Sequence, residues 1–366
     1  MGDVDLSTCF RVLALDGGGI RCYYTAALLS KLVEHFAGAR GGVGRATDPG
    51  AAFDLICGTS GGAILACALA SGVPLGRVAE LYRRQGPGIF PRPSPINEWR
   101  NLGWCMRHWQ TPSANATALR AALEGALGQE TLGALYRRRS IAVCLAATDV
   151  ARCDVRIMRT PHRSQHDGGM SLVDACMASS AAPILLPPVE YRAGSQTQRR
   201  EELLCDGGVC ANNPVLVALL EALAMAGPGR EIRVLSVSSC PSNGREGQHP
   251  GHRSLGYWID GLRLIQLSAD AQSRAAAAWA VALAPLLAQP VHVLRLIDPP
   301  LAAADIEHLR IDNAVTETFD VLDRLADASA RLNIAAASGG QDDLAWLPNF
   351  FRPAAHVGAD SASGDS

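Results

Sequence analysis

Apolar and polar residues alternate along the chain in blocks with the lengths of strands and helices. Unbroken apolar runs of roughly five to eight residues are typical of buried strands, and apolar positions three and four residues apart indicate helices. Their alternation predicts an α/β fold with a mainly parallel central sheet flanked by helices on both faces. The expected strands cover residues 10–15, 53–57, 141–148, 154–159, 203–205, 232–238 and 291–297. The expected helices cover 23–36, 63–69, 74–85, 117–127, 171–180, 212–225, 316–332 and 255–287, the last interrupted near 268–272.

The same pattern divides the chain into three regions. Residues 8–226 are expected to form the core, and residues 227–350 to add strands and helices that pack on it. The polar tail at 351–366 predicts disorder. Glycine-rich or polar stretches at 38–50 and 194–202 predict loops.

One strand-to-helix junction carries the pattern Gly-x-Ser-x-Gly, from Gly58 to Gly62 with Ser60 at its centre. Apolar runs precede and follow it, which is the strand and helix context that a nucleophile elbow requires. Glycines two residues before and after the serine leave room where the strand and helix approach closely. The helix directs its free N–H groups and positive dipole end toward the serine. Ser60 is therefore a candidate nucleophile, with an ordinary glycine-rich turn as the alternative.

A second glycine-rich turn, at Gly17, Gly18 and Gly19, follows the first predicted strand and precedes Arg21. A dinucleotide-binding fingerprint would need glycine where Cys22 stands, and a Walker loop would need a Gly-Lys-Ser/Thr sequence that is absent. The loop instead presents bare backbone N–H groups, which suit the stabilisation of a developing oxyanion. A plain strand-to-helix turn is the alternative here too.

A carboxylate followed by two glycines, Asp206-Gly207-Gly208, comes after the short apolar run 203–205. Alone, this pattern predicts only a turn. Together, in this order along the chain, the three motifs resemble those of the patatin-like phospholipase family. The resemblance covers roughly residues 10–214 and includes the sequences SSAAP at 179–183 and NNP at 212–214.

The resemblance implies a patatin-like hydrolase core with a Ser-Asp dyad. Ser60 would be the nucleophile and Asp206 its only side-chain partner, acting as general base. A carboxylate with a pKa of about 4 is a weak base at neutral pH, so we expect Asp206 to be buried, which raises its pKa. The implied oxyanion hole consists of Gly17, Gly18, Gly19 and Gly61, with Arg21 as an auxiliary residue and with Gly58, Gly62, Gly207 and Gly208 shaping the two turns.

Two positions beside this chemistry depart from the family pattern. Cys22 stands where a further glycine usually follows the arginine, and Ala63 stands where a second glycine often follows the elbow. We expect both departures to alter loop packing without removing a catalytic role.

Two other functions fit part of the sequence. A Ser-His-Asp hydrolase would place its histidine late in the chain, where His292 and His308 lie. His292, however, is inside an apolar strand, where a histidine is more often structural. The other alternative is a non-catalytic lipid-binding protein on this fold, which suits a chain that lacks one dyad member, whereas this chain has both.

Composition narrows the class of partner. The net charge is −2 over 366 residues, so there is no overall electrostatic basis for binding a nucleic acid polymer. The eleven cysteines are scattered without a C-x-x-C pair, and Cys205 and Cys210 have no histidine cluster beside them to suggest zinc. No calcium-binding loop is present either. We therefore expect no metal and no cofactor.

The same features predict a cytoplasmic protein that acts peripherally at the inner membrane surface. Scattered cysteines favour a reducing compartment over a disulfide framework. The N-terminal residues lack the basic and apolar regions of a signal peptide. The longest strongly apolar stretch, 275–288, is too short to cross a bilayer.

The proline-rich segment 86–110 contains three of the six tryptophans, Trp99, Trp104 and Trp109. Aromatic residues interleaved with cations are typical of a membrane–water interface. A loop that covers the active site or packs against the core is an equal alternative.

Two short sequences resemble a bacterial branch of patatin-like phospholipases, the cyclic-nucleotide-activated effectors of CBASS anti-phage defence. They are IFP at 89–91 and RLIDP at 295–299. The resemblance implies a phospholipase A type enzyme that is activated by a cyclic dinucleotide and cleaves membrane phospholipids. The residues themselves indicate no messenger site and leave open the head group, the acyl position and the oligomeric state.

Overall fold

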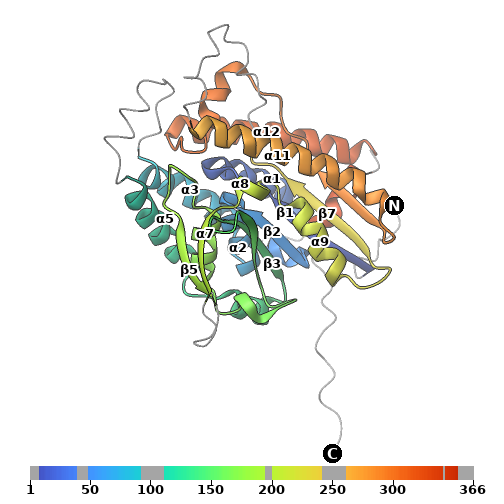
Figure 1. Cartoon of the computed structure of the whole chain (residues 1–366). Helices are drawn as coiled ribbons and strands as arrows, with labels where there is room; N and C mark the ends of the chain where they lie inside the picture. Colours follow the sequence, from blue (N-terminus) through green and yellow to red (C-terminus); the bar gives the residue numbers. More distant parts are fainter. Residues whose placement is uncertain are drawn as a thin grey trace, which may run out of the picture.

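The computed structural model describes residues 8–38, 48–91, 111–193, 200–240, 261–340 and 343–352. Over these residues the chain forms an eight-stranded sheet with the order β5-β6-β3-β2-β1-β7-β8, and β4 pairs with β3 beside this path (Figure 1). The strands are β1 (Cys9–Leu15), β2 (Leu55–Thr59), β3 (Ala142–Asp149), β4 (Asp154–Arg159), β5 (Val189–Ala193), β6 (Arg200–Asp206), β7 (Glu231–Val237) and β8 (Val291–Arg295).

Five neighbouring strands, β3, β2, β1, β7 and β8, are parallel, while β4, β5 and β6 are antiparallel additions at one side. This confirms the predicted α/β fold with a mainly parallel sheet. The late strands β7 and β8 belong to the same sheet as the earlier ones, because β7 pairs directly with β1.

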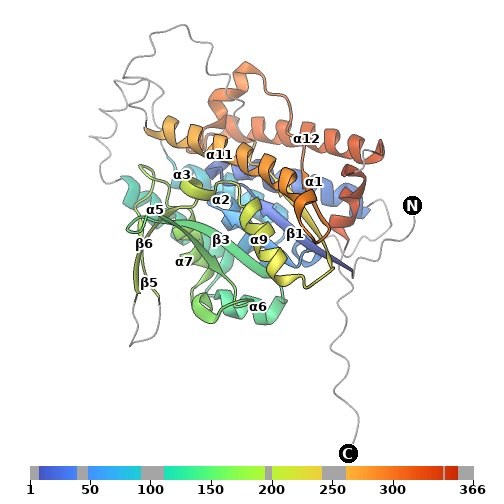
Figure 2. The same cartoon turned by 45° about the vertical axis from the view of Figure 1, so that its right-hand side comes forward.

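Helices cover both faces of the sheet (Figures 1 and 2). One buried cluster packs the sheet against α1, α2, α7 and α12, and the other packs it against α9 and α11. The α-helices are α1 (Cys22–Gly38), α2 (Gly61–Ser71), α3 (Leu75–Ile89), α5 (Thr111–Leu127), α6 (Leu132–Arg139), α7 (Leu172–Ser179), α8 (Gly208–Ala211), α9 (Val215–Met225), α11 (Gly261–Leu283) and α12 (Thr316–Ser338). The 3-10 helices are η2 (Gly19–Arg21), η3 (Pro49–Ala52), η4 (Gln165–Asp167), η6 (Ala284–Leu286), η7 (Ala303–Leu309) and η8 (Leu344–Phe351).

The uniform apolar runs of the central strands reflect burial on both faces. All seven residues of β1 are buried. Phe10, Val12 and Ala14 enter the α9 and α11 cluster, while Leu13 and Leu15 enter the opposite one. A strand covered on both sides has no polar face, so its sequence shows no alternation.

The predicted interruption of the late helix near 268–272 is wrong, because α11 runs without a break from Gly261 to Leu283. Two polar residues of this stretch make tertiary contacts. Asp270 pairs with Arg21, and Gln272 accepts a hydrogen bond from the backbone N–H of Asn213. These side chains are polar because of their tertiary contacts, while the backbone stays helical.

Several other elements differ from the sequence-based expectation. Strand β6 begins at Arg200, inside the predicted loop 194–202, because it pairs with β5, a strand that the pattern did not indicate. Helices α6 and η8 were also not predicted. Helix η8 includes Phe351, the first residue of the expected tail. Residues from 353 onward lie outside the described part of the chain.

Candidate active site

Ser60 lies at the junction of β2 and α2, in the strained conformation that a nucleophile elbow demands. Its φ of 54° and ψ of −126° are unusual for a residue with a side chain. A Cβ atom on Gly58 would lie 2.3 Å from the carbonyl oxygen of Gly62, and one on Gly62 would lie 2.5 Å from that of Asp16. Both positions therefore require glycine for the strand and helix to approach this closely.

The structure brings Ser60 and Asp206 together from elements 146 positions apart. The Ser60 hydroxyl donates a hydrogen bond of 2.7 Å to Asp206 Oδ2, and the Gly208 N–H donates one of 2.6 Å to Oδ1. Asp206 is the last residue of β6, which pairs with β3. A Cβ atom on Gly207 would lie 2.2 Å from the carbonyl oxygen of Ala146 in β3, which explains the first glycine after the aspartate.

Burial controls the charge of Asp206. Desolvation raises the pKa of this carboxyl to about 6, against the lowering effect of hydrogen bonds from Ser60 and Gly208. Within the described part of the chain, no cation contributes to lowering this pKa. The carboxylate is thus ionised at neutral pH and is a better base than an exposed aspartate.

Three glycines at the two turns lie at the same cavity. Gly18, Gly19 and Gly61 line it beside Ser60 and Asp206, and within the described residues their N–H groups donate no hydrogen bond. They are available to an oxyanion that forms next to the Ser60 hydroxyl.

Gly17 does not share this role, which corrects the prediction made from the sequence. Its N–H donates a 2.8 Å hydrogen bond to the carbonyl of Asn212. Its own carbonyl accepts hydrogen bonds from the Ser239 hydroxyl at 2.7 Å and from Asn212 Nδ2 at 3.4 Å. Gly17 therefore anchors the loop, while the residues that follow it present their N–H groups.

Arg21 is almost completely buried, with 1% of its surface exposed. Its Nη2 lies 3.2 Å from Asp270 Oδ1 on α11, while its Nε and Nη1 have no hydrogen-bond partner among the described residues. Cys22, where the sequence departs from the family pattern, fills the space next to the elbow. A Cβ atom on Gly61 would lie 2.6 Å from its sulfur.

The walls of the cavity are mainly apolar. They include residues from α2, α3, α5 and the segment before β5, with Phe90 at the end of α3. The apolar wall residues include Ile64, Tyr82, Ile89, Leu119 and Leu186. An apolar pocket that ends at a hydroxyl and three N–H groups suits a fatty acyl ester.

Comparison with known proteins places this site in a family. The patatin-like phospholipase family matches residues 13–219, which include Ser60, Asp206 and the glycine loop. The chain belongs to the patatin-like phospholipase family. It is therefore a lipid-acyl hydrolase, and the family prediction made from the sequence is confirmed.

The names of bacterial relatives of this patatin-like chain support the predicted branch of the family, that of cyclic-nucleotide-activated phospholipases. A "cGAMP-activated phospholipase" of Pseudomonas aeruginosa is 30% identical over 269 residues, covering 72% of this chain and 73% of the relative. One of Vibrio cholerae is 29% identical over 284 residues, covering 72% and 74% respectively. One of Escherichia coli is 32% identical over 213 residues, covering 58% and 55%.

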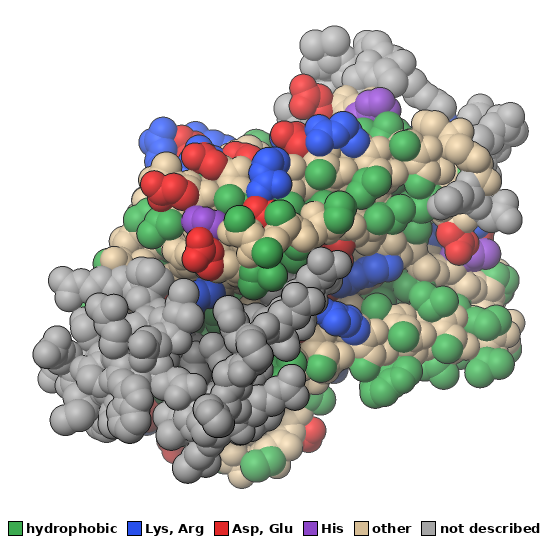
Figure 3. All heavy atoms as spheres, turned by 90° about the horizontal axis from the view of Figure 1, so that it is seen from above, with side chains coloured by type: hydrophobic (Ala, Val, Ile, Leu, Met, Phe, Trp, Pro, Cys, Tyr) green, Lys and Arg blue, Asp and Glu red, His purple; other side chains and the backbone are tan. Residues whose placement is uncertain are grey.

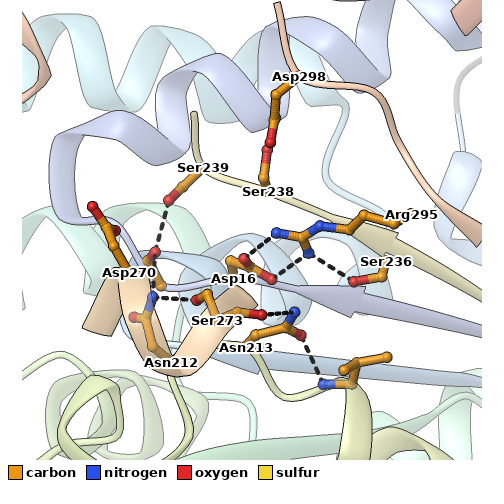
Figure 4. Close-up of polar contacts among 12 residues, drawn as sticks. Asp16, Asn212, Asn213, Ser236, Ser238, Ser239, Asp270, Ser273, Arg295 and Asp298 are labelled. Carbon is orange, nitrogen blue, oxygen red and sulfur yellow. Dashed lines mark hydrogen bonds and ion pairs between the residues drawn. The ribbon is translucent and has the colours of Figure 1, made fainter. Parts of the chain in front are cut away.

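Polar contacts that the sequence did not indicate join the glycine loop and the segment with Asn212 to β8 and α11 (Figure 4). Arg295 of β8 binds Asp16, the residue before the glycine loop, through contacts of 2.8 and 2.5 Å. Ser273 of α11 accepts a 2.8 Å hydrogen bond from Asn212 Nδ2. The only sequence signals were Asn212 in the NNP sequence and Arg295 in RLIDP, without a stated role.

Ser179, in the SSAAP sequence, holds the elbow backbone. Its hydroxyl accepts a 2.9 Å hydrogen bond from the Ser60 N–H and donates one of 2.6 Å to the carbonyl of Ala146. Tyr82 of α3 donates a 2.8 Å hydrogen bond to the carbonyl of Gly61. Such contacts fix the nucleophile in its strained conformation.

The histidines considered for a catalytic triad lie elsewhere. His292 pairs with Glu231 at 3.3 Å, with 44% of its side chain exposed, and His308 lies near Thr318 and Glu307. Among the described residues that line the cavity, none is a histidine. This geometry favours the Ser-Asp arrangement.

Two further expectations concern membranes and disulfides. Within the described residues, no helix is long and apolar enough to cross a membrane. The ten cysteines in this part of the chain are all free thiols. Trp99, Trp104 and Trp109 lie outside the described residues, whereas Ile89 and Phe90, at the start of that segment, line the cavity.

Proposed function

We propose that this chain is a phospholipase A type enzyme that cleaves membrane phospholipid esters through a Ser60–Asp206 dyad and an acyl-enzyme intermediate. The observation that carries the proposal is the 2.7 Å hydrogen bond between the Ser60 hydroxyl and Asp206 Oδ2 at the end of an apolar cavity. The names of the bacterial relatives support a phospholipid as the substrate.

In the acylation step, the Ser60 oxygen attacks the carbonyl carbon of the ester while Asp206 accepts the hydroxyl proton. The carbonyl oxygen becomes an oxyanion, which the N–H groups of Gly18, Gly19 and Gly61 stabilise. One such donor contributes roughly 3–4 kcal/mol to transition-state stabilisation. As the ester bond breaks, Asp206 returns the proton to the departing lysophospholipid alkoxide.

In the deacylation step, water attacks the acyl-Ser60 ester. Asp206 accepts a proton from the water, and the same N–H groups stabilise the second oxyanion. Collapse of this intermediate releases the fatty acid, and the proton returns to the Ser60 oxygen. The pKa of Asp206, raised by burial to about 6, suits both proton transfers near neutral pH.

The surface beside the cavity supports peripheral action at the inner face of the cytoplasmic membrane. Helix α11 contributes Ile265 and Ala269 to the cavity wall and exposes Leu264 and Leu267 beside them. The face that carries α11 and α12 shows apolar side chains among acidic and basic ones (Figure 3). Exposed leucines next to the substrate cavity would contact acyl chains while charged neighbours meet the head groups.

We further infer that a cyclic dinucleotide activates the enzyme, as in an effector of anti-phage defence. Three bacterial relatives are named as cGAMP-activated phospholipases, and two of them cover more than 70% of this chain. A cyclic dinucleotide would act as an activator and would take no part in the chemistry at Ser60.

The test is fatty-acid release from vesicles of bacterial phospholipids, with and without a panel of cyclic dinucleotides. Wild type is compared with Ser60→Ala and Asp206→Asn. The matched control is Ser171→Ala, because the Ser171 hydroxyl also lies 2.7 Å from a carboxylate, that of Asp174, at the start of α7.

The proposal expects release by wild type and Ser171→Ala, greatly increased by one cyclic dinucleotide, and none by the two dyad variants. Full activity without nucleotide would remove the activator from the proposal and leave the hydrolase. Near-normal release by Asp206→Asn would remove the dyad.

A further inference from the structure

A second buried cluster of chemically capable side chains lies on the α9 side of the sheet and plays no part in the proposed catalysis. Cys144 comes from β3, His162 from the segment after β4, and Glu221 from α9. Cys144 Sγ and His162 Nε2 are 3.9 Å apart, and His162 Nε2 and Glu221 Oε2 are 3.3 Å apart. All three donor atoms lie within 4.8 Å of one another.

These separations fit the edges of a metal-centred tetrahedron. Bonds to Zn²⁺ of about 2.0 Å from nitrogen or oxygen and about 2.3 Å from sulfur give donor-to-donor edges of roughly 3.3–3.8 Å. The sulfur and imidazole donors favour zinc over magnesium or calcium, which prefer oxygen ligands alone. The three atoms therefore need only a small contraction to share one zinc ion.

The imidazole of His162 is held in the orientation that a ligand needs. Its Nδ1 lies 2.7 Å from the hydroxyl of Thr160, which itself accepts a 2.9 Å hydrogen bond from the N–H of Val143. Metal-binding histidines are typically fixed through the nitrogen that does not bind the metal. Here that fixed nitrogen is Nδ1, and Nε2 points at Cys144 and Glu221.

Cys57 is the candidate for a fourth donor, although its sulfur lies outside the group of three atoms that are within 4.8 Å of one another. It lies directly beside Cys144 in the parallel pairing of β2 with β3, and both side chains belong to the same buried cluster on the α9 side of the sheet. We propose that Cys57, Cys144, His162 and Glu221 form a structural zinc site. Binding would release the protons carried by the two thiols and by His162 Nε2 to solvent, leaving two thiolates, one carboxylate and a neutral imidazole on Zn²⁺.

The surroundings balance the charge of such a site. Three anionic ligands and one dication leave a net charge of −1. Arg159 Nη2 lies 3.1 Å from Glu221 Oε1, and Arg163 Nη1 lies 3.3 Å from Oε2. These partly exposed guanidinium groups compensate the excess negative charge and place the cluster close to solvent, which provides a path for the ion.

The zinc ion would join β2, β3, the segment after β4 and α9 behind the nucleophile elbow, since Cys57 precedes Ser60 by only three residues. This proposal departs from the sequence-based expectation of no metal. No spacing in the sequence signals the site, because its four donors are scattered from residue 57 to residue 221.

The test measures metal directly and does not depend on lipase activity. The full chain, purified and then dialysed against trace zinc, is analysed for metal content. Replacement of zinc by Co²⁺ then reports thiolate ligation through its sulfur-to-metal absorption. The variants are Cys144→Ser and His162→Gln. The control is Cys67→Ser, because Cys67 is another buried free cysteine and belongs to no three-donor cluster in the described residues.

We expect about one zinc per chain and a thiolate–cobalt band in wild type and Cys67→Ser. We also expect at least a tenfold weaker affinity in Cys144→Ser and His162→Gln. Folded wild type that retains no zinc and shows no cobalt band would overturn the proposal, whatever the variants do. Unchanged metal content in folded Cys144→Ser would overturn it as well.

Discussion

Two buried carboxylates, Asp206 at the end of β6 and Glu221 on α9, have opposite electrostatic environments. Burial raises the pKa of Asp206, and hydrogen bonds from Ser60 and Gly208 only partly offset this effect. Burial also acts to raise the pKa of Glu221, but the hydrogen bond from His162 and the charges of Arg159 and Arg163 outweigh it and lower the pKa. A buried carboxylate without a cation is suited to accept a proton, whereas one surrounded by cations remains a fixed charge.

The comparison is tested first by removing the charge of Asp206 with the smallest change of shape. Asp206→Asn should reduce fatty-acid release by about 10⁴-fold or more, because the amide cannot accept the Ser60 proton. The matched change Glu221→Gln should leave release within a few-fold of wild type once both are shown to be folded. A loss of activity in Glu221→Gln equal to that in Asp206→Asn would contradict the separation of the two roles.

The second test measures stability to unfolding instead of fatty-acid release. Glu221→Gln should lower the free energy of unfolding by roughly 2–4 kcal/mol, because it leaves His162, Arg159 and Arg163 without their common anionic partner. Urea unfolding at neutral pH, followed by circular dichroism, measures the change. A stability equal to wild type would mean that this carboxylate is not a structural charge.

Asp206→Asn should change stability in the opposite direction. The folded state binds the Asp206 proton with a pKa of about 6, against 3.8 for an unperturbed aspartate. Proton binding by Asp206 therefore stabilises the folded state fully below pH 3.8, and this stabilisation is lost as the pH rises through about 6. At pH 7 the amide avoids the cost of burying an ionised group, so we expect stabilisation of up to about 3 kcal/mol. A variant less stable than wild type at pH 7 would contradict this account.

The smallest expected effect is on the pH dependence of activity. Because Asp206 must be ionised to act as a base, kcat/KM should rise about tenfold per pH unit below about 6 and level off above it. Initial rates on a soluble ester substrate between pH 5 and 8 measure this profile. A flat profile, or an inflection that disappears in a histidine variant, would favour the triad alternative.

Local sequence patterns predicted the parts of the site whose chemistry depends on backbone geometry. Gly58, Ser60 and Gly62 are recognisable because a close strand–helix approach excludes side chains at fixed positions. Asp206 was recognisable only through the family resemblance, since its partner Ser60 is 146 positions away. The buried strands were predicted well because both of their faces are apolar.

Features that depend on tertiary contacts escaped prediction. The predicted break in the late helix is absent, and polar residues of α11 bind Arg21 and the loop that contains Asn212 and Asn213. Gly17 was assigned to the oxyanion hole because nothing in its sequence distinguishes it from Gly18. Only the fold shows that its N–H is bound to the carbonyl of Asn212.

The most direct test of the central claim is covalent labelling of the nucleophile. Wild type, Asp206→Asn and Glu221→Gln are treated with a fluorophosphonate that reacts with activated serines, and the modified peptide is located by mass spectrometry. The account predicts rapid labelling at Ser60 in wild type and in folded Glu221→Gln, and very slow labelling in Asp206→Asn. Modification at a different serine, or equally fast labelling of Ser60 in Asp206→Asn, would contradict it.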